Sequence, residues 1–447
     1  MVAADLKNVQ GLVYNGYKKL PFAAFLFATL GDDAALSRAW LRALWVTPAL
    51  RDHLTRNEPK LAVAFAASGL RALGVPEGVI EDLPQELKDG MAKRDKVLGD
   101  TPSEWTLGRH HRLDVVLLIY AASETKRAEV LADHRARLVA AGAQVHGDEL
   151  ACEFAEREHF GFADGMSQPF VPGVHDQPRA HEHPIALGEI LLGYENEYAK
   201  LPASPRWGEF DLGANGTYLV FRKLAQNVGA LWTHLAQQAE KLGLEREAGA
   251  IWLGAKIMGR WPSGAPVALA PHQDDPKLAA SNHANNFGYI AHDPDGLHCP
   301  IASHVRRANP RDARAEDAET SLKVVNRHRI LRRGRSYGRP ISIQQAIAGG
   351  DATPRGLYFI GLNASIARGF EFIQQTWLGN PGFLGLAGEA DPIAGPGGCP
   401  FTIPADPLHI RLEPIPRVVT TLGGGYFFLP SLAAIARLAT EPPPRNP

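Results

Sequence analysis

Cysteine is scarce in this chain of 447 residues, which contains three. They are Cys152, Cys299 and Cys399, far apart and odd in number, so they form neither a disulfide framework nor a C-x-x-C metal pair. Free thiols suit a reducing compartment. The first residues lack the basic start and apolar block of a signal peptide. We therefore expect a cytoplasmic protein.

Long apolar runs and an excess of one charge are also missing. No run reaches the roughly 18 apolar residues of a membrane helix, so no membrane span is expected. Lys plus Arg number 47 and Asp plus Glu 48, and a net charge of -1 gives no global attraction to nucleic acid or an anionic membrane. The glycine-rich runs at 395–398 and 423–425 lack the Lys-Ser/Thr that completes a phosphate-binding loop.

Hydrophobic residues make up 45% of the chain, enough for a sizeable core. Strand-like and helix-like segments alternate on both sides of an irregular stretch at 174–205. This pattern predicts an α+β protein of two α/β sandwich halves, 1–205 and 206–447. The expected strands cover 22–30, 61–66, 113–120, 216–221, 357–362, 418–422 and 426–429. The expected helices cover 34–53, 124–141, 225–244, 366–377 and 431–439.

The most informative stretch is 161–170, which reads Gly-Phe-Ala-Asp-Gly-Met-Ser-Gln-Pro-Phe. It places one carboxylate between two glycines, which let the backbone approach a bulky planar ligand and adopt φ angles closed to other residues. Asp164 held in such a loop can serve as a positioned acid or base. A tight Asp-Gly turn without chemistry explains the same residues equally well.

A histidine stands in the segment 299–311, Cys-Pro-Ile-Ala-Ser-His-Val-Arg-Arg-Ala-Asn-Pro-Arg. Neutral imidazole is a common metal ligand, so His304 is a candidate. A rival interpretation takes His298, Cys299 and His304 as a zinc site. That site has no fourth ligand at a sensible spacing.

An arginine-rich segment follows at 329–338, Arg-Ile-Leu-Arg-Arg-Gly-Arg-Ser-Tyr-Gly. Most of its arginines must be solvated or bind anions. With the two earlier segments it supplies an Asp, a His and an Arg from separate parts of the chain.

Together the three segments resemble the dye-decolourising peroxidase family of haem proteins. That family carries a G-x-x-D-G signature, a proximal haem His in an H-I/V-R segment, and a distal Arg in a following R-R-G-x-x-Y-G segment. The similarity extends to 356–359, 370–377 and 423–431, and so covers nearly the whole chain. The R-x-x-F-H segment of plant-type peroxidases and the C-x-x-C-H of covalent haem attachment are both missing.

The resemblance implies two ferredoxin-like halves of the dimeric α+β barrel type. Haem b would lie between helices and sheet, mostly against the C-terminal half. It implies His304 as axial ligand of the haem iron, Asp164 as distal acid–base and Arg332 as distal cation. The other residues implied to contact the cofactor are Gly165, Ser167, Gln168, Arg311, Leu357 and Phe359. The implied reaction uses hydrogen peroxide to oxidise dyes, phenols and other aromatic donors.

Further expectations concern electron transfer and the proximal ligand. Asp391 is a candidate hydrogen-bond partner of His304, since a peroxidase iron needs an electron-rich ligand. Tyr337 and Trp377 are candidates for passing electrons from bulky donors at the surface, although plain packing explains most such residues. We expect a monomer or a homodimer. The alternatives to a peroxidase are a non-catalytic haem carrier or iron-release protein on the same fold, or a zinc-bound structural protein.

Overall fold

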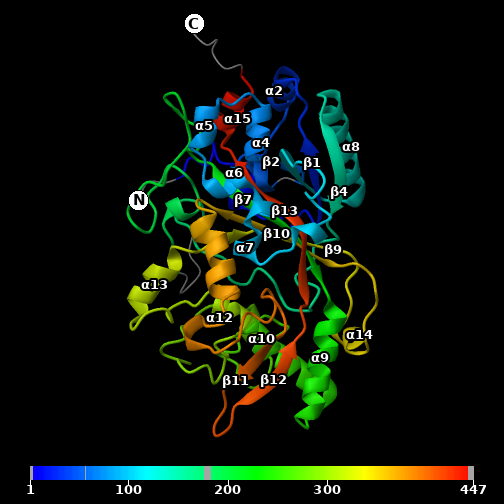
Figure 1. The fold of residues 1–447 in the computed structure, drawn as a ribbon, viewed down its shortest axis with the longest axis vertical. Helices are drawn as coiled ribbons and strands as arrows, with labels where there is room; N and C mark the ends of the chain where they lie inside the picture. Colours follow the sequence, from blue (N-terminus) through cyan, green and yellow to red (C-terminus); the bar gives the residue numbers. More distant parts are fainter. Residues whose placement is uncertain (1–3, 56, 176–182, 441–447) are drawn as a thin grey trace.

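The computed structural model describes residues 4–55, 57–175 and 183–440. These residues include one nine-stranded antiparallel sheet and two short hairpins, with α9 (Val228–Lys241), α10 (Arg246–Met258) and one hairpin beyond the end of the sheet (Figure 1). Its strands, in sheet order, are β4 (Gln144–Leu150), β1 (Phe22–Thr29), β3 (Val115–Ala121), β2 (Lys60–Phe65), β13 (Val419–Leu429), β7 (Thr217–Gln226), β10 (Gly356–Asn363) and β8 (Leu331–Arg332), with β9 (Arg335–Tyr337) also paired to β10.

The N-terminal half has the ferredoxin-like strand order β4-β1-β3-β2. Helix α2 (Ala34–Arg42) follows β1 and is capped by Asp33, whose side chain accepts two backbone N–H groups. Helix α8 (Glu124–Ala140) connects β3 to β4 and is capped by Ser123. Between β2 and β3 lie short helices, α4 (Ala67–Ala72), α5 (Glu77–Glu81), α6 (Gln85–Asp89), η1 (Met91–Arg94), α7 (Asp95–Leu98) and η2 (Pro102–Glu104).

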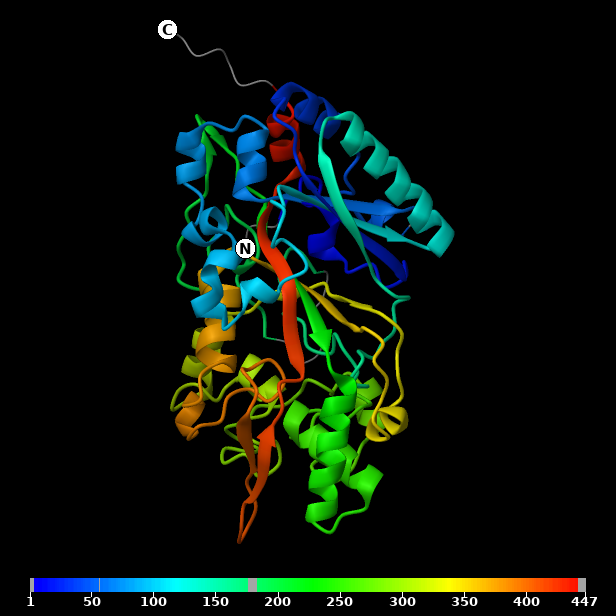
Figure 2. The same ribbon diagram turned by 45° about the vertical axis from the view of Figure 1, so that its right-hand side comes forward.

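The C-terminal half repeats the order as β13-β7-β10 with β8 and β9 at the edge. Helices α9 and α10 follow β7 and pack on each other. Two π-helical segments, η4 (Ala367–Glu371) and η5 (Ile373–Leu378), follow β10. The hairpin of β11 (Cys399–Ile403) and β12 (Ile410–Ile415) lies beside α9 and α10 at the end of the molecule opposite α2 (Figure 2). The remaining elements are α1 (Gly11–Tyr14), α3 (Arg51–Thr55), η3 (Leu187–Glu189), β5 (Arg206–Trp207), β6 (Phe210–Asp211), α11 (Pro276–Ala280), α12 (His304–Ala308), α13 (Ala318–Asn326), α14 (Ile343–Ile347), η6 (Phe383–Gly385) and α15 (Leu432–Leu438).

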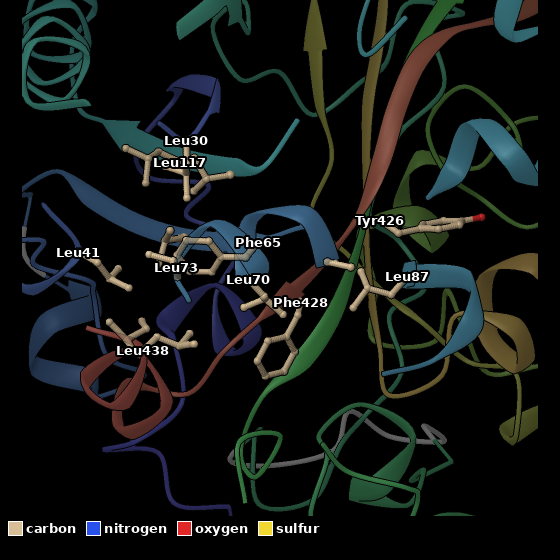
Figure 3. Close-up of a cluster of buried hydrophobic side chains, with 14 of the residues drawn as sticks. Leu30, Leu41, Phe65, Leu70, Leu73, Leu87, Leu117, Tyr426, Phe428 and Leu438 are labelled. Atoms are coloured by element: carbon tan, nitrogen blue, oxygen red, sulfur yellow. The ribbon is translucent and has the colours of Figure 1, made fainter. Parts of the chain in front are cut away.

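The two halves join where β13 meets β2, with Phe428 opposite Phe65. Both rings lie in a shared core with leucines from α2, α4 and α15 (Figure 3). Burying such side chains contributes roughly 1.5–3 kcal/mol each, so the join is stabilised by the main core. The expected α+β fold with two ferredoxin-like halves is confirmed. The division at residue 205 stays a prediction, and part of the connecting stretch, 176–182, lies outside the described residues.

Some predicted elements differ from the structure. The helix expected over 34–53 is two helices, α2 and α3, with irregular chain between them. Strand β7 runs on to Gln226, so α9 begins at Val228 rather than 225. The two strands expected around the triple glycine form one strand, β13, with a register shift between Thr421 and Gly423. The helix expected over 366–377 is π-helical, which local periodicity does not reveal.

Among the described residues, none of the helices combines the length and the apolar character needed to cross a lipid bilayer.

Candidate functional site

The loop from Gly161 to Gln168 presents a carboxylate in a fixed position. Gly161 and Gly165 have φ of 93° and 73°, the left-handed region that favours glycine. The backbone N–H of Asp164 donates to the Glu156 carbonyl at 3.0 Å, and the Gly165 N–H donates to Asp164 Oδ1 at 2.5 Å. The Asp164 side chain is 45% exposed, so its free oxygen faces solvent or a ligand.

Arg332 lies opposite this carboxylate on β8. Its Nη1 is 3.7 Å from Asp164 Oδ1, and its Nη2 donates to the Ser167 carbonyl at 3.4 Å. The side-chain amide of Gln168 accepts from the Arg332 N–H at 3.1 Å and donates to the Arg332 carbonyl at 3.3 Å. Gln168 therefore pairs with Arg332 as a neighbouring strand would, and fixes the arginine backbone beside the Asp164 loop.

The neighbouring arginine points elsewhere. Arg333 is buried, with its Nε donating to the Leu12 carbonyl at 2.8 Å and its Nη2 to the Val13 carbonyl at 2.6 Å. Successive side chains on a strand point to opposite faces, so only one of the pair can reach Asp164. The geometry therefore brings Arg332, and not Arg333, to the predicted partner.

His304 is the first residue of helix α12 and contacts a buried carboxylate. Its Nδ1 lies 3.1 and 3.0 Å from the two oxygens of Asp391, a side chain that is fully buried. The predicted contact is thus confirmed. Burial disfavours a charged imidazole, but the Asp391 charge and hydrogen bond outweigh burial and raise the pKa of His304. Burial likewise opposes ionisation of Asp391, but His304 holds the pKa of that carboxyl below its usual value.

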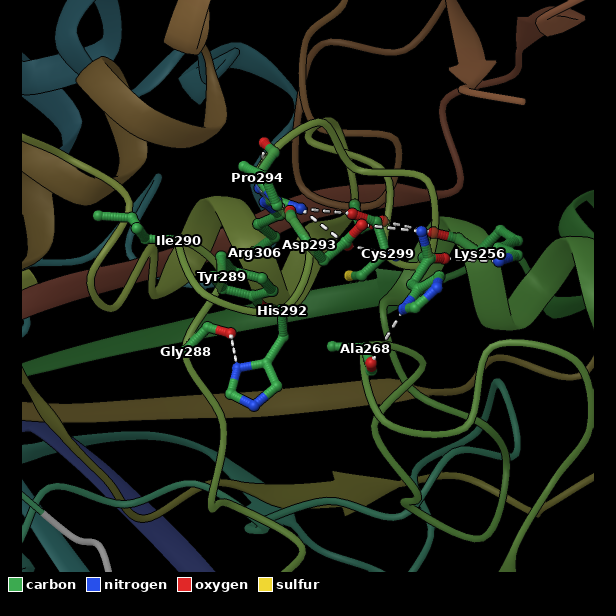
Figure 4. A network of polar contacts seen from close by, with 12 residues as sticks. Lys256, Ala268, Gly288, Tyr289, Ile290, His292, Asp293, Pro294, Cys299 and Arg306 are labelled. Carbon is green, nitrogen blue, oxygen red and sulfur yellow. Dashed lines mark hydrogen bonds and ion pairs between the residues drawn. The ribbon is translucent and has the colours of Figure 1, made fainter. Parts of the chain in front are cut away.

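Two buried arginines anchor this short helix. Arg306 donates to Asp293 Oδ2 at 3.1 Å and to the Cys299 carbonyl at 2.7 Å, and its guanidinium lies 4.2 Å from the Tyr289 ring centroid (Figure 4). Asp293 in turn accepts the Cys299 N–H at 2.8 Å. A helix of five residues is marginal alone, so these contacts determine where His304 sits.

Arg307 anchors the other side of α12. Its side chain donates to the backbone carbonyls of Trp377 at 2.8 Å and Glu389 at 2.8 Å. Glu389 stands two residues before Asp391, so Arg307 ties the helix of His304 to the segment that carries its carboxylate partner.

Asp164 and Arg332 face a cavity of about 350 Å³. Leu357 lines it, whereas Phe359, two residues along β10, packs on Phe370 with ring centroids 5.6 Å apart. The cavity is lined by Tyr14, Asn15, Gly16, Lys18, Phe154, Ala155, Arg157, Glu158, Asp164, Gly165, Gln168, Arg332, Arg333, Gly334, Arg335, Ser336 and Leu357. Five of these residues carry positive charge, and Glu158 and Asp164 are the acids.

A smaller cavity of about 30 Å³ adjoins the other side of Gln168. Arg311 lies here with a left-handed φ of 53°, an unusual conformation for arginine. Its Nη1 donates to the Asn285 and Phe287 carbonyls at 3.0 and 3.1 Å. Ser167 and Arg329 also line this cavity, and none of the described residues around it is acidic. Such a lining favours an anionic group.

Sequence reasoning missed Glu158. Its carboxylate accepts the backbone N–H groups of Phe160 at 2.9 Å and Phe162 at 3.1 Å, and the side-chain amide of Gln226 at 2.7 Å. Burial raises the pKa of Glu158 to about 7, and these donors only partly oppose burial. In the sequence, the only indication of a role for Glu158 is its position three residues before Gly161. The N-terminal residues of the cavity, from Tyr14 to Lys18, gave none, since the tertiary fold brings them there.

Tyr337 and Trp377 are both buried, 8% and 1% exposed. The Tyr337 hydroxyl donates to the Leu224 carbonyl at 3.1 Å, and its ring lies 4.8 Å from that of Tyr358. Neither ring meets a bulky donor directly, so a part in electron transfer would be that of an internal relay, and it stays a prediction.

The donor set fits haem. Because His304 uses Nδ1 for Asp391, its Nε2 is the ring nitrogen left for iron, and the side chain is 25% exposed. Arg311 and the acid-free cavity beside it fit the propionates.

The rival zinc site is not assembled. His298 Nδ1 lies 3.3 Å from the Ala268 carbonyl, and Cys299 is fully buried. In the part of the chain that the structure describes, no three His, Cys, Asp or Glu side chains are grouped to hold a metal ion.

Known proteins are similar to this chain over most of its length. The C-terminal family of Dyp-type peroxidases matches residues 207–384. A dye-decolorizing peroxidase of Mycena epipterygia is 32% identical, over 98% of this chain and 87% of its own. The multifunctional dye peroxidase DyP2 of an Amycolatopsis species is 31% identical, over 92% and 91%.

Solved structures agree with these relatives. A fungal DyP-type peroxidase from Auricularia auricula-judae superposes with a TM-score of 0.84 at 26% identity, covering 98% of this chain and all of its own. A dye-decolorizing peroxidase in complex with 2,6-dimethoxyphenol superposes with a TM-score of 0.82 at 27% identity and equal coverage. With these similarities extending over nearly its whole length, the chain belongs to the dye-decolorizing peroxidase family and is a peroxidase.

Proposed function

We propose that this peroxidase uses haem b and hydrogen peroxide to oxidise dyes, phenols and other aromatic donors. Haem, when bound, supplies the iron at which peroxide is reduced and the oxidising equivalents that the donors consume. The solved structure of a dye-decolorizing peroxidase in complex with 2,6-dimethoxyphenol supports small phenols as donors. Three free cysteines support a reducing, cytoplasmic location. We infer a monomer or homodimer.

Asp164 is assigned the proton transfer. Peroxide must lose a proton from one oxygen and gain one on the other, and a single carboxylate beside both can move it. The loop holds this carboxylate at its backbone and leaves the side chain partly exposed to the cavity. Gly165 beside it has a φ of 73°, a backbone conformation that residues with a Cβ rarely adopt.

Arg332 is assigned the stabilisation of negative charge on peroxide. Gln168 holds its backbone, and its guanidinium donates to the Ser167 carbonyl. A cation positioned in advance costs no reorganisation when charge develops. The single observation that carries the proposal is this Asp164–Arg332 pair facing one cavity. A haem carrier needs His304 but gives no reason for the pair.

On the proximal side, His304 would hold the iron through Nε2, with Asp391 orienting the ring and increasing its electron density. Arg311 would hold a propionate. Leu357 would limit what enters the cavity, and Ser167 and Gln168 would border the cofactor. Phe359 would do so less directly, since it packs on Phe370.

The test compares Arg332→Leu with Arg339→Leu in haem-loaded protein. Losing one preorganised cation is expected to slow the spectral change on mixing with peroxide by on the order of 100- to 1000-fold. Arg339 is exposed and outside the cavity lining, so its variant should match wild type.

Asp164→Asn completes the set, because it removes the proton carrier and keeps the size of the side chain. It should slow the same step. Wild-type rates in both Arg332→Leu and Asp164→Asn would contradict the roles assigned to these two residues.

A further inference from the structure

Few oxidisable rings reach the surface. Among the described residues, the large aromatic side chains that are clearly exposed are Trp45, 53% exposed, and Tyr198, 45% exposed. A donor too bulky for the distal cavity can contact only rings of this kind.

Tyr198 is held in a rigid loop. Its backbone N–H donates to Asn196 Oδ1 at 2.9 Å, and the Asn196 N–H donates to the Lys200 carbonyl at 3.0 Å. The next anchor is Glu189, which accepts the Glu197 N–H at 3.0 Å. The ring is therefore presented in one place, although it is exposed.

Two guanidinium groups stack on this ring. The Arg327 guanidinium lies 4.1 Å and that of Arg368 5.5 Å from the Tyr198 ring centroid. Arg368 also pairs with Glu189 at 2.6 Å. The Arg327 side chain is partly exposed and has no carboxylate partner among the described residues, so its charge can attract an anion.

Behind Arg368 the contacts continue inward through aromatic rings. The Arg368 carbonyl lies 2.6 Å from His328 Nδ1, and the His328 ring stacks on Phe372 with centroids 3.8 Å apart and planes at 8°. Trp377 meets both rings edge-on, 5.3 Å from His328 and 5.5 Å from Phe372.

Trp377 adjoins the proximal helix. Its carbonyl accepts from Arg307, and the next residue, Leu378, accepts the Asp391 N–H at 2.8 Å. Asp391 contacts His304. Continuous contacts therefore run from the proximal histidine to an exposed tyrosine.

The other candidates lack such a connection. Trp45 has His53 as its ring neighbour, 6.1 Å away in the N-terminal half. Around Tyr337 the contacts lead to Tyr358 and Lys223, and no exposed ring follows among the described residues.

We propose that Tyr198, with Arg327 and Arg368, is a surface site at which bulky anionic aromatic donors are oxidised, connected to the proximal side through His328, Phe372 and Trp377. This inference rests on the proposed function, which supplies the oxidising equivalents. Tyr198 gives up one electron inward and its phenolic proton to water. The donor then returns one electron and one proton, so two donor molecules are consumed for each peroxide reduced to two waters.

The test uses haem-loaded wild type, Tyr198→Phe and the matched surface control Trp45→Phe. The donors are a sulfonated aminoanthraquinone dye and 2,6-dimethoxyphenol. The ratio of dye to phenol kcat/KM should fall about tenfold or more in Tyr198→Phe and stay unchanged in Trp45→Phe. Arg327→Gln should raise the KM for the dye and weaken its dependence on salt.

A second readout does not depend on turnover. Wild type treated with peroxide and a nitroso spin trap should carry the trap on Tyr198 in peptide mass spectrometry, and Trp45 should remain unlabelled. Phenol oxidation with an unlabelled Tyr198 and an unchanged dye ratio would overturn the surface site alone. Oxidation of neither donor by wild type would overturn the proposed function and the surface site with it.

Discussion

At the residue scale, Asp164 and Arg332 do not hold each other in place. Their charged atoms are 3.7 Å apart and both side chains are more than a third exposed. Exposed ion pairs of this kind contribute about 0–1 kcal/mol. Backbone contacts fix the loop instead, and Glu158 provides two of them.

Glu158 makes stability depend on pH in an uncommon direction. Its pKa rises from 4.5 to about 7 in the fold, so between these values the folded protein binds more protons than the unfolded chain. The contribution of Glu158 to the free energy of unfolding then falls as pH rises across this window. In Glu158→Gln this fall should be smaller, as measured by urea unfolding at pH values between about 4 and 8.

The matched control is Glu156→Gln, because Glu156 stands two residues before Glu158 and is exposed. It should keep the wild-type pH dependence. An equal slope in wild type and Glu158→Gln would show that Glu158 is not the group that titrates.

At the element scale, the sequence predicted strands better than helices. Strands β1, β2, β3 and β10 are short apolar runs, and a buried sheet explains such runs without knowledge of distant residues. None of the expected helices covers helix α12, because its stability comes from Arg306 and Arg307, whose hydrogen-bond partners lie outside the helix.

Strand β8 shows how an element of two residues can orient a functional side chain. It pairs with β10 on one side, at Gly361 opposite Arg332. On its other side the Gln168 amide replaces a strand partner. The resemblance placed Gln168 near the cofactor, whereas its contact with the Arg332 backbone is visible only in the fold.

Replacing the side-chain amide of Gln168 should make the position of Arg332 less fixed. Gln168→Leu removes two hydrogen bonds, each contributing about 1 kcal/mol, so the reaction with peroxide should slow about tenfold or more. Gln168→Glu can still accept the Arg332 N–H and should fall between Leu and wild type. Stopped-flow mixing with peroxide measures both variants at equal haem content. A wild-type rate in Gln168→Leu would show that β8 needs no second partner.

At the scale of the whole molecule, one sheet joins the halves while the site draws on both. The loop carrying Asp164 comes from the first half and Arg332, His304 and Asp391 from the second. The sequence motifs predicted these residues because each motif is local and distinctive. They did not predict the cavity wall from Tyr14 to Lys18, or the surface ring of Tyr198, because long-range packing alone brings them into place.

A ligand that binds the folded chain but not the unfolded chain stabilises the folded state. At a concentration 100 times its Kd it raises the free energy of unfolding by about 2.7 kcal/mol. Haem added to cofactor-free protein should therefore raise the Tm, through His304 on iron and contacts such as Arg311 around the ring. His304→Ala should lose much of this gain. His298→Ala should keep it, since His298 contacts the Ala268 carbonyl. Metal-free protoporphyrin IX should give wild type and His304→Ala the same smaller gain, because it fills the pocket without an iron bond. Calorimetry with both ligands separates the two contributions, and a full haem gain in His304→Ala would place the axial ligand elsewhere.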